Sequence, residues 1–141
     1  MITGININEV RSYVSKHDPD KNNPTKFLIG VLDPNLRSFI EDQTTSFEFS
    51  SKNPSDAAKA NINAGKRNLL AIKFGLRGIE NFLDPETKSP IQFSTNSTPV
   101  GCKNYPAVTD RILAMIPREI RDELAKVILS ENVLSEDEIK N

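Results

Sequence analysis

The stretch of residues 68–93, NLLAIKFGLRGIENFLDPETKSPIQF, constrains the fold of this chain more than any other part of the sequence. Apolar residues in its first half recur at helical spacing: Leu69, Ile72, Leu76, Ile79 and Leu83. This spacing predicts a helix with one buried face. Turn-forming residues follow, and the apolar run 91–93 then predicts a short strand. The stretch is therefore expected to build the core, and no residue pattern in it indicates a reaction.

Two glycines, Gly75 and Gly78, interrupt the predicted helix. A glycine in a helix interior costs about 1 kcal/mol relative to alanine, so each position needs a physical reason. Either another backbone approaches closely there, in the C-terminal helix or in another subunit, or the helix bends or stops near this pair and resumes at IENFL. The sequence leaves both explanations open.

The length and composition of the chain indicate one soluble domain that spans residues 1–141. The 18 basic and 19 acidic residues nearly balance, so the basic excess typical of nucleic-acid-binding proteins is absent and no nucleic-acid partner is predicted. A single cysteine excludes an intrachain disulfide. No apolar run approaches the roughly 20 residues that cross a bilayer, and the first residues lack the pattern of a signal peptide. We therefore expect a chain that is cytoplasmic at synthesis and has no membrane contact.

The opening residues 1–14 fit either extended structure or a short helix, and they are followed by a loop, a strand and a helix. RSYVSKH alternates as an edge strand does, and HDPDKNNP, residues 17–24, is typical of a turn or mobile loop. Residues 25–32, TKFLIGVL, form the best strand candidate. Asp33 and Pro34 then match the N-cap and first-position preferences of a helix, which we predict over residues 34–42.

Residues 43–54, QTTSFEFSSKNP, are rich in Ser and Thr and lack helical periodicity, so they form either a strand or a flexible arm. Phe47 and Phe49 alternate there, which means that one face of the segment requires burial. That burial takes place against its own domain or against a neighbouring subunit to which the segment adds a strand. Ser55 is expected to cap a long helix that runs through Asn63 and onward.

Two consecutive helices are predicted in the C-terminal third. Thr109 or Asp110 caps RILAM, and Pro117 occupies the first position of the next helix. The buried face of that helix is built by Ile120, Leu124, Val127 and Ile128.

Residues 94–106, STNSTPVGCKNYP, contain prolines and small polar groups and are expected to form a long loop. Together with residues 17–24 and 43–54, this loop is suited to docking on a partner. Residues 135–141 begin with a capping box, SEDE, and are expected to fray at the terminus.

The only histidine, His17, lies beside Asp18 and Asp20, which together offer three metal ligands. One imidazole and two carboxylates in a flexible loop rarely hold a metal without further ligands, so a solvated turn is the favoured interpretation. Cys102 beside Lys103 is interpreted as an ordinary free cysteine rather than an activated nucleophile. The sequence contains neither a phosphate-binding glycine motif nor local support for a His-dependent triad. We predict no enzymatic activity, no cofactor and no metal.

Three basic residues, Lys66, Lys73 and Arg77, are expected to share one side of the central helix. Such a cluster is either a solvated face or a docking surface for an acidic partner. Together with Phe47 and Phe49, these are the candidate partner-binding residues. Acidic residues gather in the C-terminal third, so association of two copies through opposite charges is a further option.

Residues 75–94, GLRGIENFLDPETKSPIQFS, are followed by a loop and then by IPREIRDELAKVILSENVLSEDEIKN. Together with TKFLIGVLDPNLRSFIED, this pattern resembles that of small morphogenesis proteins of tailed bacteriophages. The shared features are a glycine–leucine helix end, an aromatic residue in NF, an acidic turn, PxxF and a helix started by proline. Ile79 and Glu80 stand where related sequences often have tryptophan, and no functional residue is carried over.

The resemblance implies a non-enzymatic virion assembly protein, either a structural component of head, neck or tail or a tail-assembly chaperone. It would contact other phage structural or assembly proteins, in the virion or in the host cytoplasm. A small phage effector that binds and inhibits a host protein is the alternative, since loops and a mixed-charge surface suit it equally well.

For the fold we expect an α+β class that is predominantly helical. One small sheet, from residues 25–32 and 91–93, would pack with the central amphipathic helix and the C-terminal helices.

Overall fold

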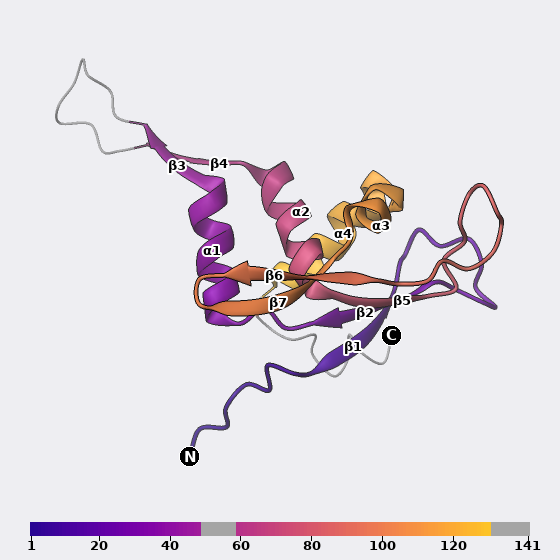
Figure 1. The fold of residues 1–141 in the computed structure, drawn as a ribbon, viewed down its shortest axis with the longest axis horizontal. Coiled ribbons are helices and arrows are strands. Elements are labelled where there is room, and N and C mark those ends of the chain that lie inside the picture. Colours follow the sequence, from indigo (N-terminus) through magenta and orange to yellow (C-terminus); the bar gives the residue numbers. More distant parts are fainter. Residues whose placement is uncertain (49–58, 131–141) are drawn as a thin grey trace.

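The computed structural model of the chain describes residues 1–48 and 59–130, which contain four helices and seven strands (Figure 1). The helices are α1 (Pro34–Thr44), α2 (Ala64–Gly75), α3 (Asp110–Met115) and α4 (Arg118–Leu129). The strands are β1 (Val10–Val14), β2 (Lys26–Gly30), β3 (Thr45–Glu48), β4 (Lys59–Ile62), β5 (Leu76–Glu80), β6 (Thr95–Val100) and β7 (Lys103–Val108). Within the described ranges the strands form three small antiparallel sheets, β1-β2-β5, β3-β4 and β6-β7. The α+β class is therefore correct, but the expectation of a predominantly helical chain with one sheet is wrong.

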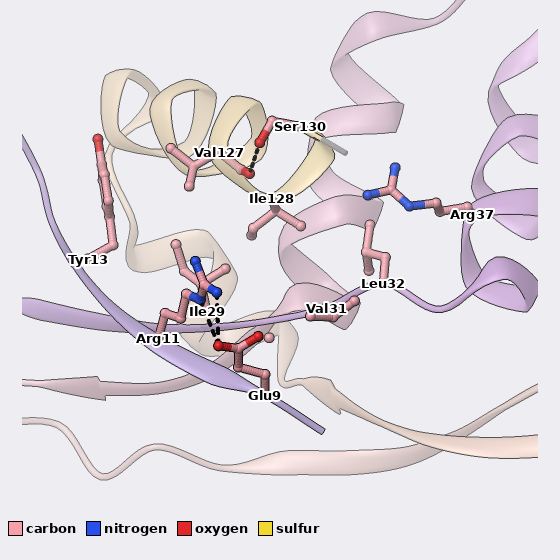
Figure 2. A pocket seen from close by; sticks show the side chains of 11 residues that line it. Glu9, Arg11, Tyr13, Ile29, Val31, Leu32, Arg37, Val127, Ile128 and Ser130 are labelled. Carbon is pink, nitrogen blue, oxygen red and sulfur yellow. Dashed lines mark hydrogen bonds and ion pairs between the residues drawn. The ribbon is translucent and has the colours of Figure 1, made fainter. Parts of the chain in front are cut away.

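The β1-β2-β5 sheet has the apolar strand β2 at its centre and β1 at one edge. Phe27 and Ile29 of β2 are buried, which is why this segment occupies the middle of the sheet. The predictions of a strand within residues 25–32 and of an edge strand in RSYVSKH are confirmed. On β1, the Arg11 side chain turns back to Glu9, with which it forms an ion pair of 2.8 Å (Figure 2).

Helix α1 begins as the sequence predicts. The Asp33 Oδ1 atom accepts a hydrogen bond of 2.9 Å from the backbone N–H of Leu36, and Pro34 stands at the first helical position. Leu36 and Ile40 are almost fully buried, so one face of the helix joins the core.

The β3–β4 hairpin connects the end of α1 to the start of α2 and projects beyond both helices (Figure 1). Within the predicted segment 43–54, the strand alternative is therefore correct for residues 45–48, whereas residues 43 and 44 are the last two of α1. The long helix expected from Ser55 through Asn63 is wrong over residues 59–62, which pair as a strand, whereas Ser55 itself lies outside the described residues. Helix α2 starts only after Asn63, whose side chain accepts a hydrogen bond from the backbone N–H of Lys66.

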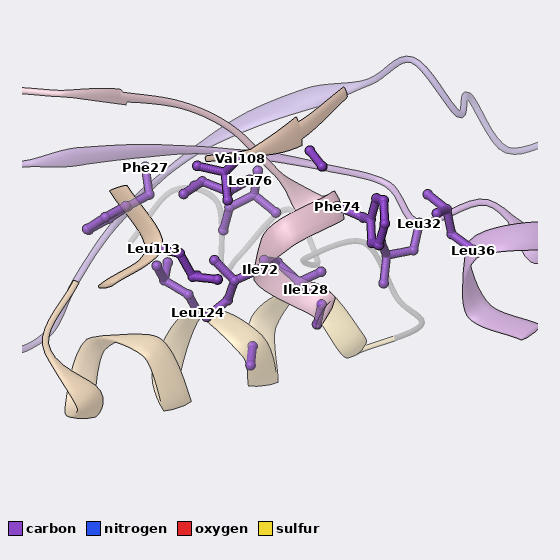
Figure 3. Close-up of a cluster of buried hydrophobic side chains, with 14 of the residues drawn as sticks. Phe27, Leu32, Leu36, Ile72, Phe74, Leu76, Val108, Leu113, Leu124 and Ile128 are labelled. Carbon is purple, nitrogen blue, oxygen red and sulfur yellow. The ribbon is translucent and has the colours of Figure 1, made fainter. Parts of the chain in front are cut away.

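The core forms around α2, which packs against α1, α3, α4, β5 and β7. Ala71 and Ile72 have no exposed surface, and Leu124 of α4 is equally buried. Figure 3 shows Ile72 and Leu124 in the space between the strands and α4. Complete burial of a side chain of this size contributes about 1.5–3 kcal/mol to folding.

The predicted central helix is wrong beyond Gly75. Helix α2 ends there, and residues 76–80 form strand β5, which pairs with β2. Leu76 and Ile79 are buried as expected, but as strand residues opposite Ile29 and Phe27, so their spacing fits both structures. The expected strand at residues 91–93 is also wrong, because these residues have no regular structure.

Gly75 and Gly78 both lie where another residue approaches closely. A Cβ atom at Gly75 would lie 2.5 Å from Ile128 Cγ2 of α4, and a Cβ atom at Gly78 would lie 2.8 Å from Leu28 Cδ1 of β2. The groups that approach both glycines are side chains rather than another backbone as expected, and at Gly75 the side chain belongs to the C-terminal helix. The helix also stops at this pair, but it does not resume after it.

The long loop expected at residues 94–106 is instead the β6–β7 hairpin. Tyr105, Ala107 and Val108 of β7 are buried, so the hairpin contributes to the core. Its turn contains Gly101 with φ of 65°, a conformation that glycine adopts without steric cost. The prediction is wrong because residues of low strand propensity are held in place by pairing and burial.

The two C-terminal helices are confirmed as α3 and α4. Thr109 is the N-cap residue of α3, and Pro117 precedes the first residue of α4. Leu124 and Ile128 are buried, whereas Ile120 and Val127 are half-buried beside the core. The expected fraying of residues 135–141 falls outside the described residues.

Glu123 of α4 holds the end of β1 and the loop that follows it. Its carboxylate accepts hydrogen bonds from the Tyr13 hydroxyl at 2.6 Å, the Ser15 hydroxyl at 2.7 Å and the Lys16 backbone N–H at 2.8 Å. Burial would raise the pKa of this carboxyl, but the three hydrogen bonds and the nearby His17 outweigh burial and lower it. Burial of the Tyr13 hydroxyl and its hydrogen bond to Glu123 raise the pKa of Tyr13 above its ordinary value.

Candidate functional site

Of the three basic residues predicted to share one side of a helix, Lys66 and Lys73 do so, being seven residues apart in α2, but Arg77 does not. Lys66 is exposed in the first turn of α2, and Lys73 lies near its last turn with its Nζ 6.0 Å from the centre of the Phe74 ring. Arg77 lies beyond the end of the helix, in β5. The prediction fails for Arg77 because the chain changes from helix to strand between Lys73 and Arg77.

The two phenylalanines of the predicted docking segment are only partly described. Phe47 belongs to β3, where its backbone is paired with Ala60 of β4. Phe49 lies outside the described residues. Their proposed contact with a partner therefore stays a prediction.

His17 and Cys102 lie beyond opposite ends of β1. His17 is exposed in the loop that follows Val14, on the side of Glu123. Cys102 is an exposed free cysteine in the β6–β7 turn, and it lines the same hollow as Ile7, which precedes Val10. With about 3.3 Å per residue along a strand, β1 keeps these two side chains well apart.

Arg77 lines a groove of about 330 Å³, which we call the Arg77 groove. One wall is formed by the N-terminal residues 7–10, and another by residues 103–106 of β7. Val31, Asp33 and Leu36 complete the lining between these two walls. The groove thus lies between the β1-β2-β5 sheet, the start of α1 and the β6–β7 hairpin.

A β-bulge places Arg77 in this groove. Leu28 pairs with Gly78 and Ile29 pairs with Leu76, so Arg77 is the extra residue of β5 that has no partner in β2. Bulges bend a strand and turn the extra side chain in a new direction. The Arg77 side chain lies across Gly30, where a Cβ atom would overlap its Nε atom. The absence of a side chain at Gly30 therefore makes room for the guanidinium.

Asp33 organises the polar end of the Arg77 groove. Its Oδ2 atom accepts hydrogen bonds from the buried Tyr105 hydroxyl at 2.7 Å and from Lys103 Nζ at 3.3 Å, while Oδ1 caps α1. The Lys103 Nζ atom also lies 5.0 Å from the centre of the Tyr105 ring, within the range of a cation–π interaction. Asn35 donates a further hydrogen bond of 3.1 Å to the Tyr105 hydroxyl.

The pKa values of Asp33 and Arg77 reflect this arrangement. Burial would raise the pKa of Asp33, but its hydrogen bonds from Leu36, Tyr105 and Lys103 and the charge of Lys103 lower it overall. Burial lowers the pKa of Arg77, and the charge of Asp33 offsets part of this effect. Both side chains remain charged at neutral pH, and Arg77 carries its charge in a partly dehydrated position.

A second hollow of about 410 Å³ adjoins the Arg77 groove beyond Lys103. Both hollows share Ile7, Asp33, Lys103 and Tyr105 in their linings, while the second adds Asn35 and Cys102. The two hollows thus form one elongated depression along the hairpin.

A smaller cavity of about 50 Å³ lies between β1, β2 and the end of α4 (Figure 2). Its volume accommodates no more than a few water molecules. The Arg37 side chain points from α1 toward the end of α4, where it donates a hydrogen bond of 3.3 Å to the Leu129 carbonyl (Figure 2). A cation at this position stabilises a helix C-terminus, so the cavity has a structural role.

The sequence predicted Arg77 as a site residue but missed Asp33, Lys103 and Tyr105 as its neighbours. Asp33 was recognised only as a helix cap, and residues 103–105 were assigned to a loop. The available signal was the pair Gly101–Cys102, a two-residue connection between segments of similar length, which is typical of a hairpin.

Comparison of the chain with protein-family models, curated proteins and solved structures finds no match. Within residues 1–48 and 59–130, no group of three or more His, Cys, Asp or Glu residues is arranged to hold a metal ion. No helix in these ranges is long and apolar enough to cross a membrane.

Proposed function

We propose that this chain is a non-enzymatic bacteriophage virion assembly protein that acts through protein–protein contacts. It serves as a structural head, neck or tail component or as a tail-assembly chaperone. The resemblance of its sequence to small phage morphogenesis proteins supports this role, and so does one structural observation, the exposure of apolar side chains along the N-terminal segment.

The N-terminal segment, residues 1–9, begins with residues that extend away from the body of the molecule (Figure 1), and its last three residues line the Arg77 groove. Ile2 and Ile5 are 100% and 74% exposed, and Met1 and Ile7 are exposed as well. Contiguous exposed apolar side chains are uncommon on soluble proteins and are typical of surfaces that bind a partner. The segment leads directly into β1, which is an edge strand of its sheet, and an extended chain of this kind binds by adding a strand to a neighbouring sheet.

The projecting β3–β4 hairpin is a second extension of the fold (Figure 1). Ile62 of β4 is 56% exposed, so this hairpin also presents an apolar side chain to solvent. Two extensions on one small body suit a protein that joins neighbours in an assembly.

The test is purification of the chain, with an affinity tag at its C-terminus, from cells that produce the phage that encodes it. We expect it either in purified particles or in a complex with phage structural proteins before assembly, as detected by mass spectrometry. Presence in particles identifies a structural component, and presence only in the earlier complex identifies a chaperone. A stable complex with a host protein and with no phage protein would contradict the proposal and favour the effector alternative.

A double variant, Ile2→Ser with Ile5→Ser, tests the role of the N-terminal segment. Neither side chain lines the Arg77 groove, and both are exposed, so the fold is expected to stay intact. We expect at least tenfold less co-purified phage protein, because burial of two isoleucine side chains contributes about 3–6 kcal/mol and a loss of about 1.4 kcal/mol already weakens binding tenfold. Leu83→Ser, which changes another exposed apolar residue outside the segment, is the matched control and should have no effect. Unchanged co-purification with the double variant would exclude this segment as the contact.

A further inference from the structure

The least explained charge in the described residues is that of Arg77. Its guanidinium is half-buried, and its one hydrogen bond within the described part of the chain runs from Nη2 to the Val31 carbonyl, at 3.3 Å. A guanidinium has five N–H donors, and removing its charge from water is costly unless a partner compensates it. The ion pairs within residues 1–48 and 59–130 do not include Arg77. Arg77 therefore has donors available toward the groove.

The acidic residues of the groove are already occupied. Both oxygens of Asp33 accept hydrogen bonds, from the Leu36 backbone on one side and from Tyr105 and Lys103 on the other. Asp33 forms an ion pair with Lys103, and Glu9 forms one with Arg11. The charge of Asp33 acts on Arg77, but within the described residues no carboxylate accepts a hydrogen bond from the Arg77 guanidinium.

We propose that the Arg77 groove binds a Glu or Asp side chain on an extended segment of a partner protein, whose carboxylate accepts hydrogen bonds from the Arg77 guanidinium. This proposal rests on the proposed function, in which the chain acts through protein–protein contacts, and it adds the chemistry of the partner.

Charge and geometry favour a carboxylate. A carboxylate brings one negative charge to the Arg77 guanidinium, whereas a phosphate dianion would place excess negative charge beside Asp33. The two oxygens of a carboxylate also match the planar fork of a guanidinium, which binds them through two parallel hydrogen bonds.

The shape of the depression favours a protein segment over a small molecule. Small-molecule sites usually bury most of their ligand, whereas the Arg77 groove continues past Lys103 into the second hollow. Ile7, Leu36 and Pro106 provide apolar contacts along the way. An extended chain with apolar residues beside the acidic one fills such a depression.

Gly30 and the bulge act as positioning features for Arg77. The guanidinium reaches the groove only because Gly30 has no side chain in its path. A Gly30→Ala variant keeps every charge and displaces the Arg77 side chain, whose Nε, Cγ and Cδ atoms lie closest to the new Cβ atom, so it separates the position of the charge from its presence.

The experiment is a titration of the full chain, labelled with ¹⁵N, with two five-residue peptides followed by NMR. One is acetyl-Ala-Val-Glu-Val-Ala-amide, and the other has Gln in place of Glu. We expect saturable shifts of the Arg77 Nε–H signal and of the Gly30 and Lys103 amides with the Glu peptide. The Gln peptide should bind about tenfold more weakly, since a charge-assisted hydrogen bond is roughly twice as strong as a neutral one.

Four variants complete the test. Arg77→Gln should weaken binding of the Glu peptide about tenfold, and Arg77→Lys should weaken it less, because it retains the charge without the fork. Gly30→Ala should weaken binding with the charge unchanged. Arg118→Gln removes an exposed arginine in the first turn of α4 and should bind as the wild type does. If Arg77→Gln does not fold, as judged from its spectrum, Arg77→Lys and Gly30→Ala decide the outcome.

Equal affinity for the Glu and Gln peptides, or unchanged binding by Arg77→Lys and Gly30→Ala, would overturn the proposal. Acetate that binds as tightly as the Glu peptide would also overturn it, because the site would then be one for free anions. If the peptide fails to bind while the wild-type chain still co-purifies with phage proteins, the proposed function stands and only the groove assignment is wrong. If no phage protein co-purifies, the proposed function fails whatever the peptide result.

Discussion

At the scale of single residues, the glycines show how closely the elements of this fold approach each other. Gly75 ends α2 against Ile128 of α4, and Gly30 makes room for Arg77. In both cases the sequence shows only a glycine, a residue of low helix and strand propensity. The side chain that leaves no room for a Cβ atom at this glycine belongs to a residue distant in the sequence. By contrast, Gly65 contacts little, since a Cβ atom there would lie 3.8 Å from the nearest neighbour, Asn63 Oδ1.

Gly75→Ala is expected to destabilise the protein by about 1–3 kcal/mol, because the new Cβ atom would lie 2.5 Å from Ile128 Cγ2 and the two helices would have to separate. The measurement is the free energy of unfolding in urea. Gly65→Ala in the first turn of α2 is the matched control, and it should stabilise the protein slightly, because it lowers the entropy of the unfolded chain. A Gly75→Ala variant as stable as the wild type would contradict the close packing of α2 on α4.

At the scale of elements, the β6–β7 hairpin contributes buried residues to the core and forms one wall of the Arg77 groove. Its turn consists of Gly101 and Cys102, and Gly101 has φ of 65°. The turn brings Lys103 and Tyr105 to Asp33 at the start of α1. A change in the turn should therefore alter the positions of the groove residues Lys103 and Tyr105 as well as the stability of the hairpin.

Gly101→Ala is expected to destabilise the protein by about 1–2 kcal/mol, because a residue with a Cβ atom is strained at positive φ. Thermal unfolding followed by circular dichroism measures the effect. Gly101→Asn should lie between the wild type and Gly101→Ala, because asparagine tolerates this conformation better than alanine. Equal melting temperatures for all three proteins would show that the turn does not require positive φ.

At the scale of the whole molecule, two carboxylates connect elements that are far apart in the sequence. Asp33 joins the start of α1 to β7, and Glu123 joins α4 to β1. The pKa of each lies below its ordinary value because hydrogen bonds to the charged form outweigh burial. The unfolded chain, with ordinary carboxyl pKa values of about 4, therefore takes up protons before the folded chain does as the pH falls. The stabilisation is complete above about pH 5 and is lost as the pH falls through the folded-state values.

We expect the free energy of unfolding to fall between pH 5 and about pH 3 and the Glu123→Gln variant to lose less over this interval. At pH 7 this variant should be less stable than the wild type by about 1–3 kcal/mol, because Tyr13, Ser15 and Lys16 lose a charged acceptor. Urea unfolding at a series of pH values provides the measurement. Glu119→Gln, at an exposed position on α4, is the control and should follow the wild type. A pH dependence that is identical in Glu123→Gln and the wild type would exclude Glu123 as a contributor.

The sequence by itself determined the elements whose signals are local. Asp33 and Pro34 predicted the start of α1 because capping depends on adjacent residues, and the apolar run of β2 predicted a strand. The amphipathic spacing of α4 likewise predicted which of its residues face the core. The sequence also selected Arg77 as a candidate site residue, although on a helix that does not extend that far.

Only the tertiary structure decided that residues 76–80, 95–100 and 103–108 are strands. Leu76 and Ile79 fit a helix or a strand equally well, and the pairing with β2 decided between them. Thr95–Val100 has weak strand propensity, and its partner β7, buried against α2, determined its conformation. The Arg77 groove was beyond local inference for the same reason, because Arg77, Asp33 and Lys103 meet only after three separate elements have packed together.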